Sequence, residues 1–507
     1  MSTRSAVVSD RRIMPSIEPV TSSPTEAKMA KATGETPSLS LYADRARIYP
    51  KAVSGIARDI KWAVLLFCLT VYYTLPWVRW DRGPNEASQA LLLDLQRERF
   101  YVLNLELWPQ DIYFLTGALI LGAVGLFLVT SLFGRVWCGY ACPQTVWTDL
   151  FMWVERQIQG DRNERMRRDK APASFDRAWR KVTTHAAWIV IAFWTGGAWI
   201  MYFVDAPTVA REFWTGQAST AVYGFTFLFT ATTYVLAGWA REQVCTYMCP
   251  WPRFQASMLD EQSIIVTYQG WRGEPRGHRR HDSAQNAGNC IDCRACVNVC
   301  PTGIDIRDGI QLECINCGLC IDACNEIMDK TGGAPWLITW DTLARQKAAA
   351  SGKRERLRFF RPRTFIYVAA LLLAVSVMGV ALATRSHQIL SVQHDRAPLF
   401  VHLKDGAYRN AYTVKIANKT QRDASFTLAI GKLEDGLLTQ AEESERASTL
   451  TLAVPADTIA TFRVLAVGRP AHLRDGSQEV DFTLRNTGTG ERTEYESIFM
   501  GPGAPVR

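Results

Sequence analysis

The chain has 507 residues, 48% of them hydrophobic, and a net charge of +8 from 57 Lys and Arg against 49 Asp and Glu. That length exceeds one compact domain, so several modules are expected. The basic residues alternate with apolar stretches along the chain instead of gathering in one patch, which argues against a nucleic-acid-binding protein.

Five segments contain no Asp, Glu, Lys or Arg and are apolar. They are Trp62–Val78, Ile112–Gly134, Val182–Val204, Phe213–Ala240 and Thr364–Thr384. About 20 apolar residues suffice to cross a bilayer, so four segments are long enough and the first lies at the lower limit. We therefore expect an α-helical membrane domain with about five transmembrane helices, four in residues 57–262 and a fifth in residues 363–385.

Lys and Arg are abundant in the segments that would face one side of the membrane. Residues 1–61, 135–181 and 241–362 hold 10, 10 and 16 of them, whereas residues 79–111 hold four and 205–212 hold one. Positive charge is retained on the cytoplasmic side, so the pattern predicts a cytoplasmic N-terminus and an exported C-terminus. Residues 1–56 are polar, and we expect a flexible cytoplasmic tail without a cleavable signal peptide.

A cysteine pair is repeated after the second and fourth apolar segments. Cys138 and Cys142 belong to one C-x3-C-P motif, and Cys245 and Cys249 belong to another. Each motif follows an equivalent helical hairpin, so the repeat is parallel and the two pairs are expected at the same depth.

The spacing of these four cysteines suggests a metal site. Residues four apart lie on one face of a helix, and the proline after each pair marks a helix end. Thiolates prefer Cu(I), which makes Cys138, Cys142, Cys245 and Cys249 candidate copper ligands and catalytic residues. A disulfide or a packing role is the alternative.

Two other residues within predicted spans are given no redox role. Cys68 is alone in the first segment, so we expect it to pack against neighbouring helices. His185 is the only histidine in a span, and a membrane haem of the b type needs paired axial ligands, so haem is disfavoured.

Eight cysteines in residues 263–345 repeat the bacterial ferredoxin pattern C-x2-C-x2-C-x3-C twice. In that pattern the fourth cysteine of each run ligates the other cluster. One predicted [4Fe–4S] cluster is ligated by Cys290, Cys293, Cys296 and Cys324, and the other by Cys314, Cys317, Cys320 and Cys300. A zinc module is the alternative, but two complete runs disfavour it. The module is expected in the cytoplasm, where thiols stay reduced.

A basic linker at residues 346–362 precedes the fifth predicted span, and the residues after that span have a different pattern. Apolar residues there alternate with period two; Tyr412, Val414 and Ile416, for example, share one face. Polar turns separate several such runs, so residues 386–507 are predicted to form an all-β sandwich.

Several motifs resemble the FixG/RdxA/CcoG family. They are Leu75–Asp81, Trp108–Asp111, Arg135–Gln144, Arg241–Gln255, Arg272–Gly277, Cys290–Lys330, Asp395–Leu399 and Arg409–Val414. The resemblance covers nearly all of the chain after residue 40, although Asn325 stands where proline is usual. It implies a multi-pass protein of the bacterial cytoplasmic membrane, with the clusters in the cytoplasm and an immunoglobulin-like sandwich in the periplasm.

The resemblance also implies a role in assembling cbb3-type cytochrome c oxidase through reduction of Cu(II) to Cu(I). The implied partners are copper ions, oxidase assembly factors or copper chaperones and transporters, and a cytoplasmic electron donor. Two other functions are compatible with the motifs. One is a quinol-linked electron carrier of the ferredoxin type, and the other is a non-enzymatic scaffold for oxidase assembly.

Overall fold

The computed structural model describes residues 47–502, apart from residues 84–85, 278–287, 442–444 and 470–475. Most of the expected flexible tail therefore lies outside the described residues, as does part of the basic stretch before the first cysteine run. The chain separates into Met1–Ile48 and Tyr49–Arg507, and every element below belongs to the second unit.

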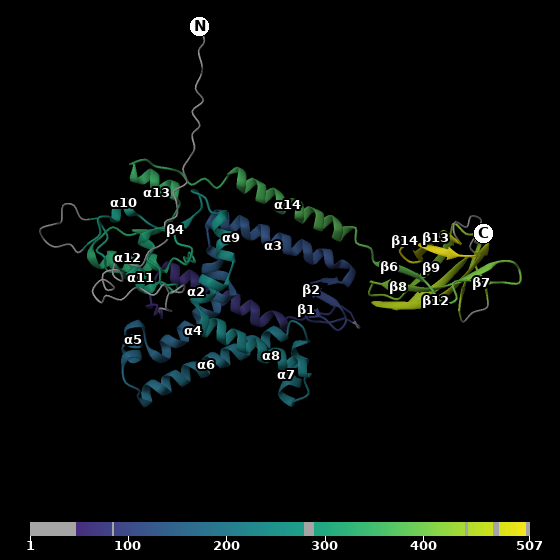
Figure 1. The fold of residues 1–507 in the computed structure, drawn as a ribbon, viewed down its shortest axis with the longest axis horizontal. Helices are drawn as coiled ribbons and strands as arrows, with labels where there is room; N and C mark the ends of the chain where they lie inside the picture. The colour runs from purple at the N-terminus through teal and green to yellow at the C-terminus, as the bar shows by residue number, and fades with distance from the viewer. Residues whose placement is uncertain (1–46, 84–85, 278–287, 442–444, 470–475, 503–507) are drawn as a thin grey trace, which may run out of the picture. The chain divides into compact units, whose positions relative to one another are not determined.

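Four helices among the described residues are long and apolar enough to cross a membrane. They are α2 (Ile56–Thr74), continued by η1 (Leu75–Trp77); α3 (Ile112–Phe133), preceded by η2 (Pro109–Asp111); α8 (Thr220–Thr233), continued by η4 (Tyr234–Ala240); and α14 (Pro362–Ala383). α14 lies beside α3 and buries none of its own residues (Figure 1). Because so much apolar side-chain surface is left uncovered, these helices need lipid around them, and the chain is a membrane protein.

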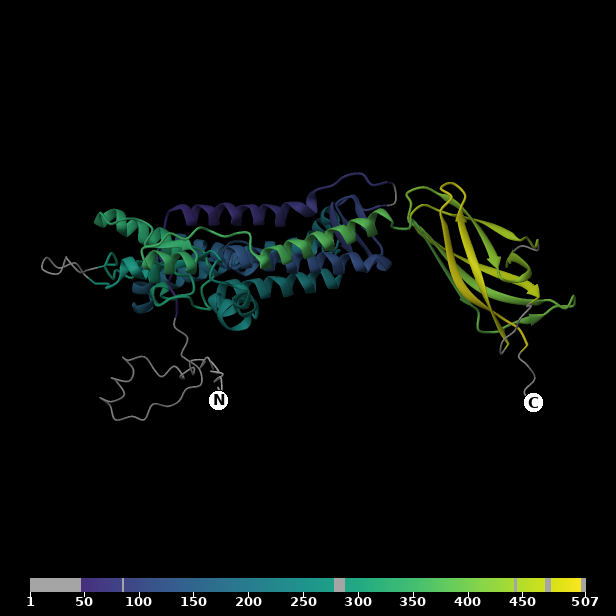
Figure 2. The same ribbon diagram turned by 90° about the horizontal axis from the view of Figure 1, so that it is seen from above.

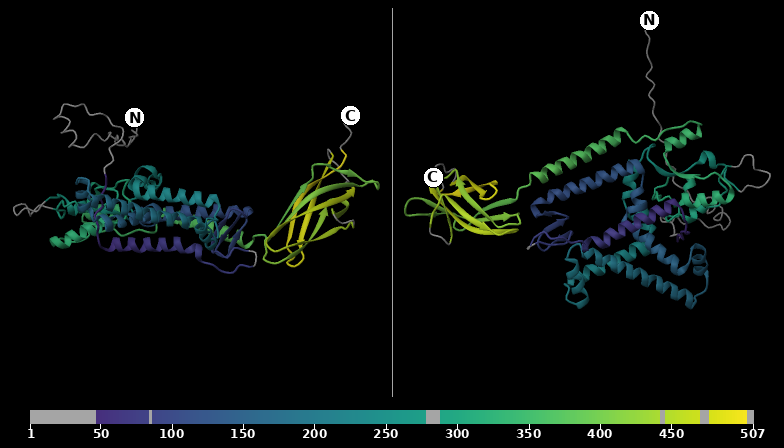
Figure 3. Two further views of the ribbon diagram at one scale, coloured as in Figure 1. Left: turned by 90° about the horizontal axis from the view of Figure 1, so that it is seen from below. Right: turned by 180° about the vertical axis from the view of Figure 1, so that it is seen from behind.

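The third predicted span differs from the other four in the hydropathy of its helix. Residues 182–200 belong to α6 (Phe175–Ile200), but α6 is not among the helices that are apolar enough to cross a membrane. His185 and several tryptophans and glycines lower its mean hydropathy. α6 packs against both α4 (Pro143–Gln159) and α8, within the helical part that Figure 3 shows from two further sides. Trp188 of α6 is buried against Phe151 of α4.

The predicted start of the fourth span is wrong by several residues. Phe213 belongs to a separate helix, α7 (Ala206–Thr215), which ends at Gly216 in the left-handed conformation. α8 then begins after Ser219, whose side chain accepts a hydrogen bond from the backbone N–H of Val222. Residues 213–240 carry no charge, but they include the end of one helix and the N-cap of the next. The absence of charge alone therefore could not reveal this break.

Between α2 and α3 the chain forms a three-stranded antiparallel sheet that was not predicted. Its strands are β1 (Leu91–Asp94), β2 (Arg99–Val102) and β3 (Leu105–Leu107), paired in that order. Strands of three or four residues are too short to give a clear alternating pattern.

The eight-cysteine module contains one small sheet and several short helices. β4 (Ile265–Tyr268) pairs antiparallel with β5 (Ile338–Asp341). The helices around them are α10 (Gly270–Gly273), α11 (Ala295–Val299), η6 (Ile306–Asp308), α12 (Leu319–Thr331) and α13 (Leu343–Ala350). Ile321 and Leu337 share one buried core with Cys290, Cys296 and Cys324, so these cysteines lie inside the module.

The C-terminal part is a sandwich of two sheets, as the alternating pattern predicts (Figure 2). One sheet has the order β10-β12-β8-β6, with β7 beside β8, and the other has the order β11-β9-β13-β14. The strands are β6 (Gln388–His394), β7 (Val401–His402), β8 (Tyr408–Asn418), β9 (Ala424–Gly431), β10 (Glu434–Gln440), β11 (Thr449–Val454), β12 (Thr458–Arg469), β13 (Ser477–Asn486) and β14 (Arg492–Met500). Tyr412, Val414 and Ile416 of β8 are fully buried between the sheets.

Candidate redox site

The two cysteine runs of the module fold into matching loops. The residues on either side of Cys293 both have φ of 55°, and the residues on either side of Cys317, Asn316 and Gly318, have φ of 60° and 75°. Left-handed backbone on both sides of the central cysteine turns each loop sharply, and such turns direct N–H groups into a concavity that suits an iron–sulfur cluster.

Neighbouring cysteines in the structure follow the crossed ferredoxin pattern. Burial, together with the nearby Cys293 and Cys290, raises the pKa of Cys324 to about 11. Burial also raises the pKa of Cys317, and Cys300 adds to this rise. The last cysteine of each run thus lies near cysteines of the other run, as two crossed cubanes require. The individual ligand sets remain a prediction.

The surroundings of the eight thiols fit two [4Fe–4S] clusters. All cysteines of the chain are free, so none is tied up in a disulfide. Exposure is mixed within each set. In the first set Cys293 is exposed and the other three cysteines are buried, whereas in the second set Cys317 is buried and the other three are half-buried.

Arg307 is a charged neighbour of the first set that the sequence patterns did not reveal. Its Nη1 lies 4.0 Å from Cys290 Sγ and 2.6 Å from the carboxylate of Asp292, and its Nη2 lies 2.6 Å from Asp305. These two carboxylates hold the guanidinium in place beside the sulfur. A fixed positive charge there stabilises the negative charge of a thiolate-ligated cluster.

The first cysteine of each C-x3-C-P motif lies in a π-helical turn, not in the α-helical turn that the spacing predicts, and the second cysteine follows the turn in extended conformation as its C-cap. Cys138 lies in η3 (Trp137–Ala141), and Cys245 lies in η5 (Val244–Met248). Both turns close in the same way, because the N–H of Cys142 donates to the Trp137 carbonyl and that of Cys249 to the Val244 carbonyl, each at 2.8 Å. After each turn comes a further helix, α4 in the first motif and α9 (Trp251–Met258) in the second.

The two motifs come together in space although they are far apart in sequence. Burial, together with the nearby Cys142, Cys245 and Cys249, raises the pKa of Cys138 to about 12. Burial, together with Cys142 and Cys249, raises the pKa of Cys245 to about 11. Among the described residues, however, no three cysteine sulfurs lie within 4.8 Å of one another. For three of these thiolates to bind one copper ion, the distances between their sulfur atoms would therefore have to become shorter.

Two glutamines, the buried Gln255 and the half-buried Gln144, join the two motifs. The thiol of Cys138 donates to Gln255 Oε1 at 3.1 Å, and Gln255 Nε2 donates in turn to Thr130 at 3.2 Å. From the other motif, Gln144 Nε2 donates to the backbone carbonyls of Leu236 at 2.8 Å and Arg241 at 3.2 Å. Both glutamines belong to stretches that resemble the family, but the cysteine spacing gave no hint of their role.

The first thiol turn packs directly on the loop of the second cysteine set. A Cβ added to Gly139 would lie 2.7 Å from the carbonyl oxygen of Ile315, so only glycine fits there. The next residue, Tyr140, donates its hydroxyl to the Cys317 carbonyl at 2.9 Å. Cys138 itself packs against the apolar cluster that contains Cys317.

Arg135 strengthens the same junction from the end of α3. Its guanidinium donates to the backbone carbonyls of Leu312 and, at 3.3 Å, of Cys314 in the cysteine module. It also donates to the carbonyl of Pro252 at 2.9 Å, just after the second thiol motif. One side chain therefore joins both thiol motifs to the second cysteine set.

The second thiol turn has no such partner in the module. Tyr140 is 7% exposed, whereas its equivalent in the repeat, Tyr247, is 74% exposed. Position 139 is glycine and the matching position 246 is threonine, which is the sequence signal that could have distinguished the two turns.

A buried group of charges attaches the module to the N-terminal end of α2. Asp322 of α12 accepts hydrogen bonds from the backbone N–H groups of Ala57 and Arg58, so it caps α2. The Arg58 side chain pairs with Asp149 at 2.8 Å, and Lys61 lies 3.8 Å from the same carboxylate. The positive charge of Lys61 also opposes the rise that burial causes in the pKa of Cys317.

Cys68 and His185, which were predicted to have no redox role, lie on α2 and α6. Cys68 is a half-buried free thiol on α2. His185 on α6 shares a hydrogen bond of 2.9 Å with the hydroxyl of Tyr234.

Comparisons with known proteins agree with this organisation. Residues 240–343 match the family described as a 4Fe-4S dicluster domain, residues 115–160 match a 4Fe-4S binding domain, and residues 378–502 match the Ig-like fold at the C-terminal of FixG. The chain is 44% identical to protein RdxB of Cereibacter sphaeroides, over 92% of this chain and 99% of that protein. It is 42% identical to the nitrogen fixation protein FixG of Rhizobium meliloti, over 92% and 95%. It is 45% identical to protein RdxA of Cereibacter sphaeroides, over 77% and 83%.

Proposed function

The chain belongs to the FixG/RdxA family, and from that premise we propose that it is a membrane cupric reductase with two [4Fe–4S] clusters. The electrons come from a cytoplasmic donor, and the acceptor is Cu(II) held by Cys138, Cys142, Cys245 and Cys249. Each transfer converts one Cu²⁺ and one electron into Cu⁺.

The observation that carries this proposal is the junction between the first thiol turn and the loop of the second cysteine set. Clusters bound at the two cysteine sets supply one-electron transfer between them. The exposed Cys293 of the first set offers a point at which electrons can enter, and Tyr140 lies on the Cys317 carbonyl of the second set. Cys138 lies at the end of this route, in contact with the apolar cluster around Cys317.

The four membrane thiols favour the product oxidation state. Soft thiolate ligands bind Cu(I) more strongly than Cu(II), so holding copper there makes its reduction more favourable. Two of these thiols, Cys138 and Cys245, stay protonated when no metal is bound, because burial and the neighbouring cysteines raise the pKa of Cys138 to about 12 and that of Cys245 to about 11. Copper binding must then displace their protons.

We propose that the Cu(I) serves the assembly of cbb3-type cytochrome c oxidase in the bacterial cytoplasmic membrane. The recipients would be oxidase assembly factors, copper chaperones or copper transporters. In this arrangement the clusters face the cytoplasm and the sandwich faces the periplasm, as the distribution of Lys and Arg predicts.

A quinol-linked carrier is the second candidate, and an apolar cavity of about 640 Å³ favours it. The cavity is lined by Tyr73, Trp77, Trp194 and Phe213, among others. Trp77 and the capped end of α2 at Ala57 are 20 residues apart, which corresponds to about 30 Å along a helix. A quinol in this cavity would therefore lie at the far end of α2 from the cysteine module, so we favour copper as the partner of the thiols.

The test is reduction of Cu(II), followed with a Cu(I)-specific chelator, in single Cys→Ser variants at positions 138, 142, 245 and 249. Cys68→Ser is the matched control, because it removes a free thiol from α2 without touching either motif. Each of the four variants should lose most of the activity while its iron and sulfide content stays at the parental value, and the control should keep both. Parental activity in all four variants with full clusters would show that copper is reduced elsewhere, and a carrier or scaffold would then be the better account.

A further inference from the structure

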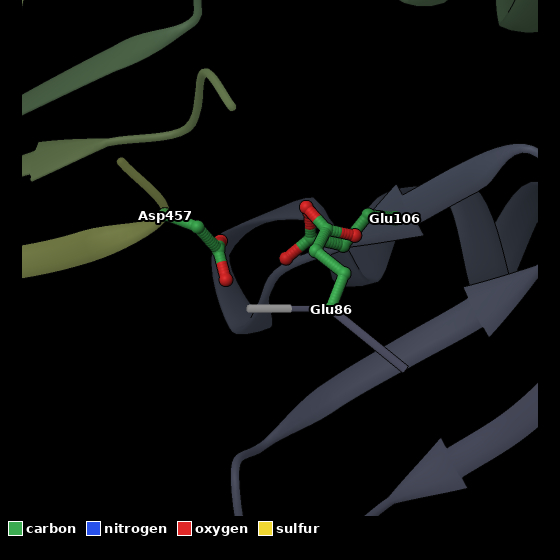
Figure 4. A group of neighbouring side chains, drawn as sticks. All are labelled: Glu86, Glu106 and Asp457. Atoms are coloured by element: carbon green, nitrogen blue, oxygen red, sulfur yellow. The ribbon is translucent and has the colours of Figure 1, made fainter. Parts of the chain in front are cut away.

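Three acidic side chains meet where the unpredicted β1–β3 sheet touches the C-terminal sandwich. Glu86 precedes β1, Glu106 lies in β3, and Asp457 lies in the turn before β12, with φ of 51°. One carboxylate oxygen from each lies within 4.8 Å of the other two. Figure 4 shows the carboxylates of Glu86 and Glu106 next to each other, with that of Asp457 pointing towards them.

The positive charge in contact with these carboxylates is less than their negative charge. Arg99 pairs with Glu106 at 3.0 Å and also with Asp457. Arg82 lies nearby, but its guanidinium donates to the backbone carbonyls of Ala87, Gln89, Ala90 and Leu103. Burial raises the pKa of Glu106 to about 8, and repulsion from Asp457 and Glu86 adds to the rise. Three acidic groups crowded here need further compensation by a proton or a cation.

A second observation also indicates a missing partner at this place. Tyr101 is fully buried, and its hydroxyl makes no hydrogen bond of ordinary geometry with a described residue, although the guanidinium of Arg99 lies near it. It lies directly opposite Glu106 in the β2–β3 pair, so the two side chains lie on the same face of the sheet. Asp457 is also buried, and its Oδ1 has no partner either. Buried oxygens of this kind are almost always satisfied.

We propose that Glu86, Glu106 and Asp457 bind a divalent cation of the hard, oxygen-preferring class, with Ca²⁺ as its representative. Carboxylate and hydroxyl oxygens are ligands for Ca²⁺ and Mg²⁺, whereas Cu(I) prefers sulfur. The cation links the loop between α2 and α3 to the sandwich. This role is separate from copper reduction and does not depend on it.

A second link between the same two parts uses only protein side chains. Asp111, at the start of α3, pairs with Arg385 at 2.6 Å and with Lys419 at 3.3 Å. In this group the side chains of Arg385 and Lys419 supply two positive charges for one carboxylate, so Asp111 needs no bound metal ion for compensation. By contrast, the group around Glu106 has three carboxylates and one paired guanidinium, so its negative charge exceeds the positive charge that the protein supplies there.

The experiment uses the purified full-length chain in detergent, stripped with a chelator and titrated with Ca²⁺ in a calorimeter. One Ca²⁺ should bind per chain, and at a hundredfold excess over Kd the thermal midpoint of the sandwich should rise by about 10 °C. In Glu106→Gln and Asp457→Asn the affinity should fall by at least about tenfold. Glu98→Gln is the matched control, since Glu98 is an exposed carboxylate in the turn between β1 and β2 and the variant should bind as the parent does.

Terbium provides a measurement that does not rely on unfolding. Tb³⁺ has the ligand preferences of Ca²⁺, and a tyrosine as close as Tyr101 should sensitise its emission, which added Ca²⁺ should quench. No binding by the parental chain would overturn the proposal and would show that Arg99 alone compensates the carboxylates. Undiminished binding by Glu106→Gln and Asp457→Asn would overturn it as well, because the ion would then lie elsewhere.

Discussion

The hydroxyl of Tyr140 donates a hydrogen bond of 2.9 Å to the backbone carbonyl of Cys317. This bond joins a residue between the first two membrane cysteines to a predicted ligand of the second cluster, 177 positions later in the chain. It places the first thiol motif directly against the second cysteine set, and the first prediction below depends on this contact.

Gly139→Ala should slow copper reduction about tenfold, because the new Cβ would lie 2.7 Å from the Ile315 carbonyl and push the thiol turn away from the module. Iron and sulfide content should not change. Gly125→Ala in α3 is the control, since nothing lies within 4 Å of a Cβ at that position. Stopped-flow measurement of cluster reoxidation by Cu(II) gives the rate, and equal rates in both variants would contradict the proposed route.

Lys61→Met should lower the midpoint potential of one cluster by a shift on the order of 50 mV. Lys61 is buried, and Ala57, one helical turn earlier, lies against Gly318 beside Cys317. A buried ammonium favours the more negative, reduced state of a nearby cluster, and Lys61→Arg should restore the potential. Redox titration followed by electron paramagnetic resonance provides the measurement, with exposed Lys347→Met as the control. An unchanged potential in Lys61→Met would show that its charge does not reach the cluster.

Chemical analysis of the purified chain should give about eight iron and eight sulfide, the sum for two cubanes. A preparation filled with zinc and silent after dithionite would support the zinc alternative. A content of about twelve would have another meaning, namely that Cys138, Cys142, Cys245 and Cys249 hold a third cluster.

The topology prediction can be tested with reporter fusions. An export-dependent phosphatase fused after Arg507 should be active, and one fused after Ser351 should be inactive, because α14 lies between the two positions. A cytoplasmic reporter at the same positions should give the opposite result. If the phosphatase were active after Ser351, the cysteine module would face the oxidising side of the membrane.

The patterns that sequence analysis predicted well are local. The eight-cysteine module needs only short spacings, and the buried faces of strands such as β8 need only an alternating pattern. The helix–loop–helix break at Gly216 was missed, because the absence of charge does not distinguish one helix from two. The strands β1 to β3 were missed because they are so short.

The parts that could not be predicted depend on contacts between distant residues. Nothing near Gly139 indicates that Ile315 will lie above it, and nothing near Asp322 indicates that it will cap α2. The group of Glu86, Glu106 and Asp457 likewise forms only when the sandwich meets the β1–β3 sheet. Sites of this kind can be recognised only in the folded structure, because their residues are of common types and lie far apart in the sequence.

Anaerobic mixing of the dithionite-reduced, desalted chain with Cu(II) tests the central claim most directly. Two reduced clusters hold two electrons, so about two Cu(I) per chain should form as both cluster signals disappear. The quadruple Cys→Ser variant at positions 138, 142, 245 and 249 should keep its cluster signals under the same conditions. Rapid loss of the signals with full Cu(I) yield in that variant would contradict the account, because the electrons would then reach copper without the membrane thiols.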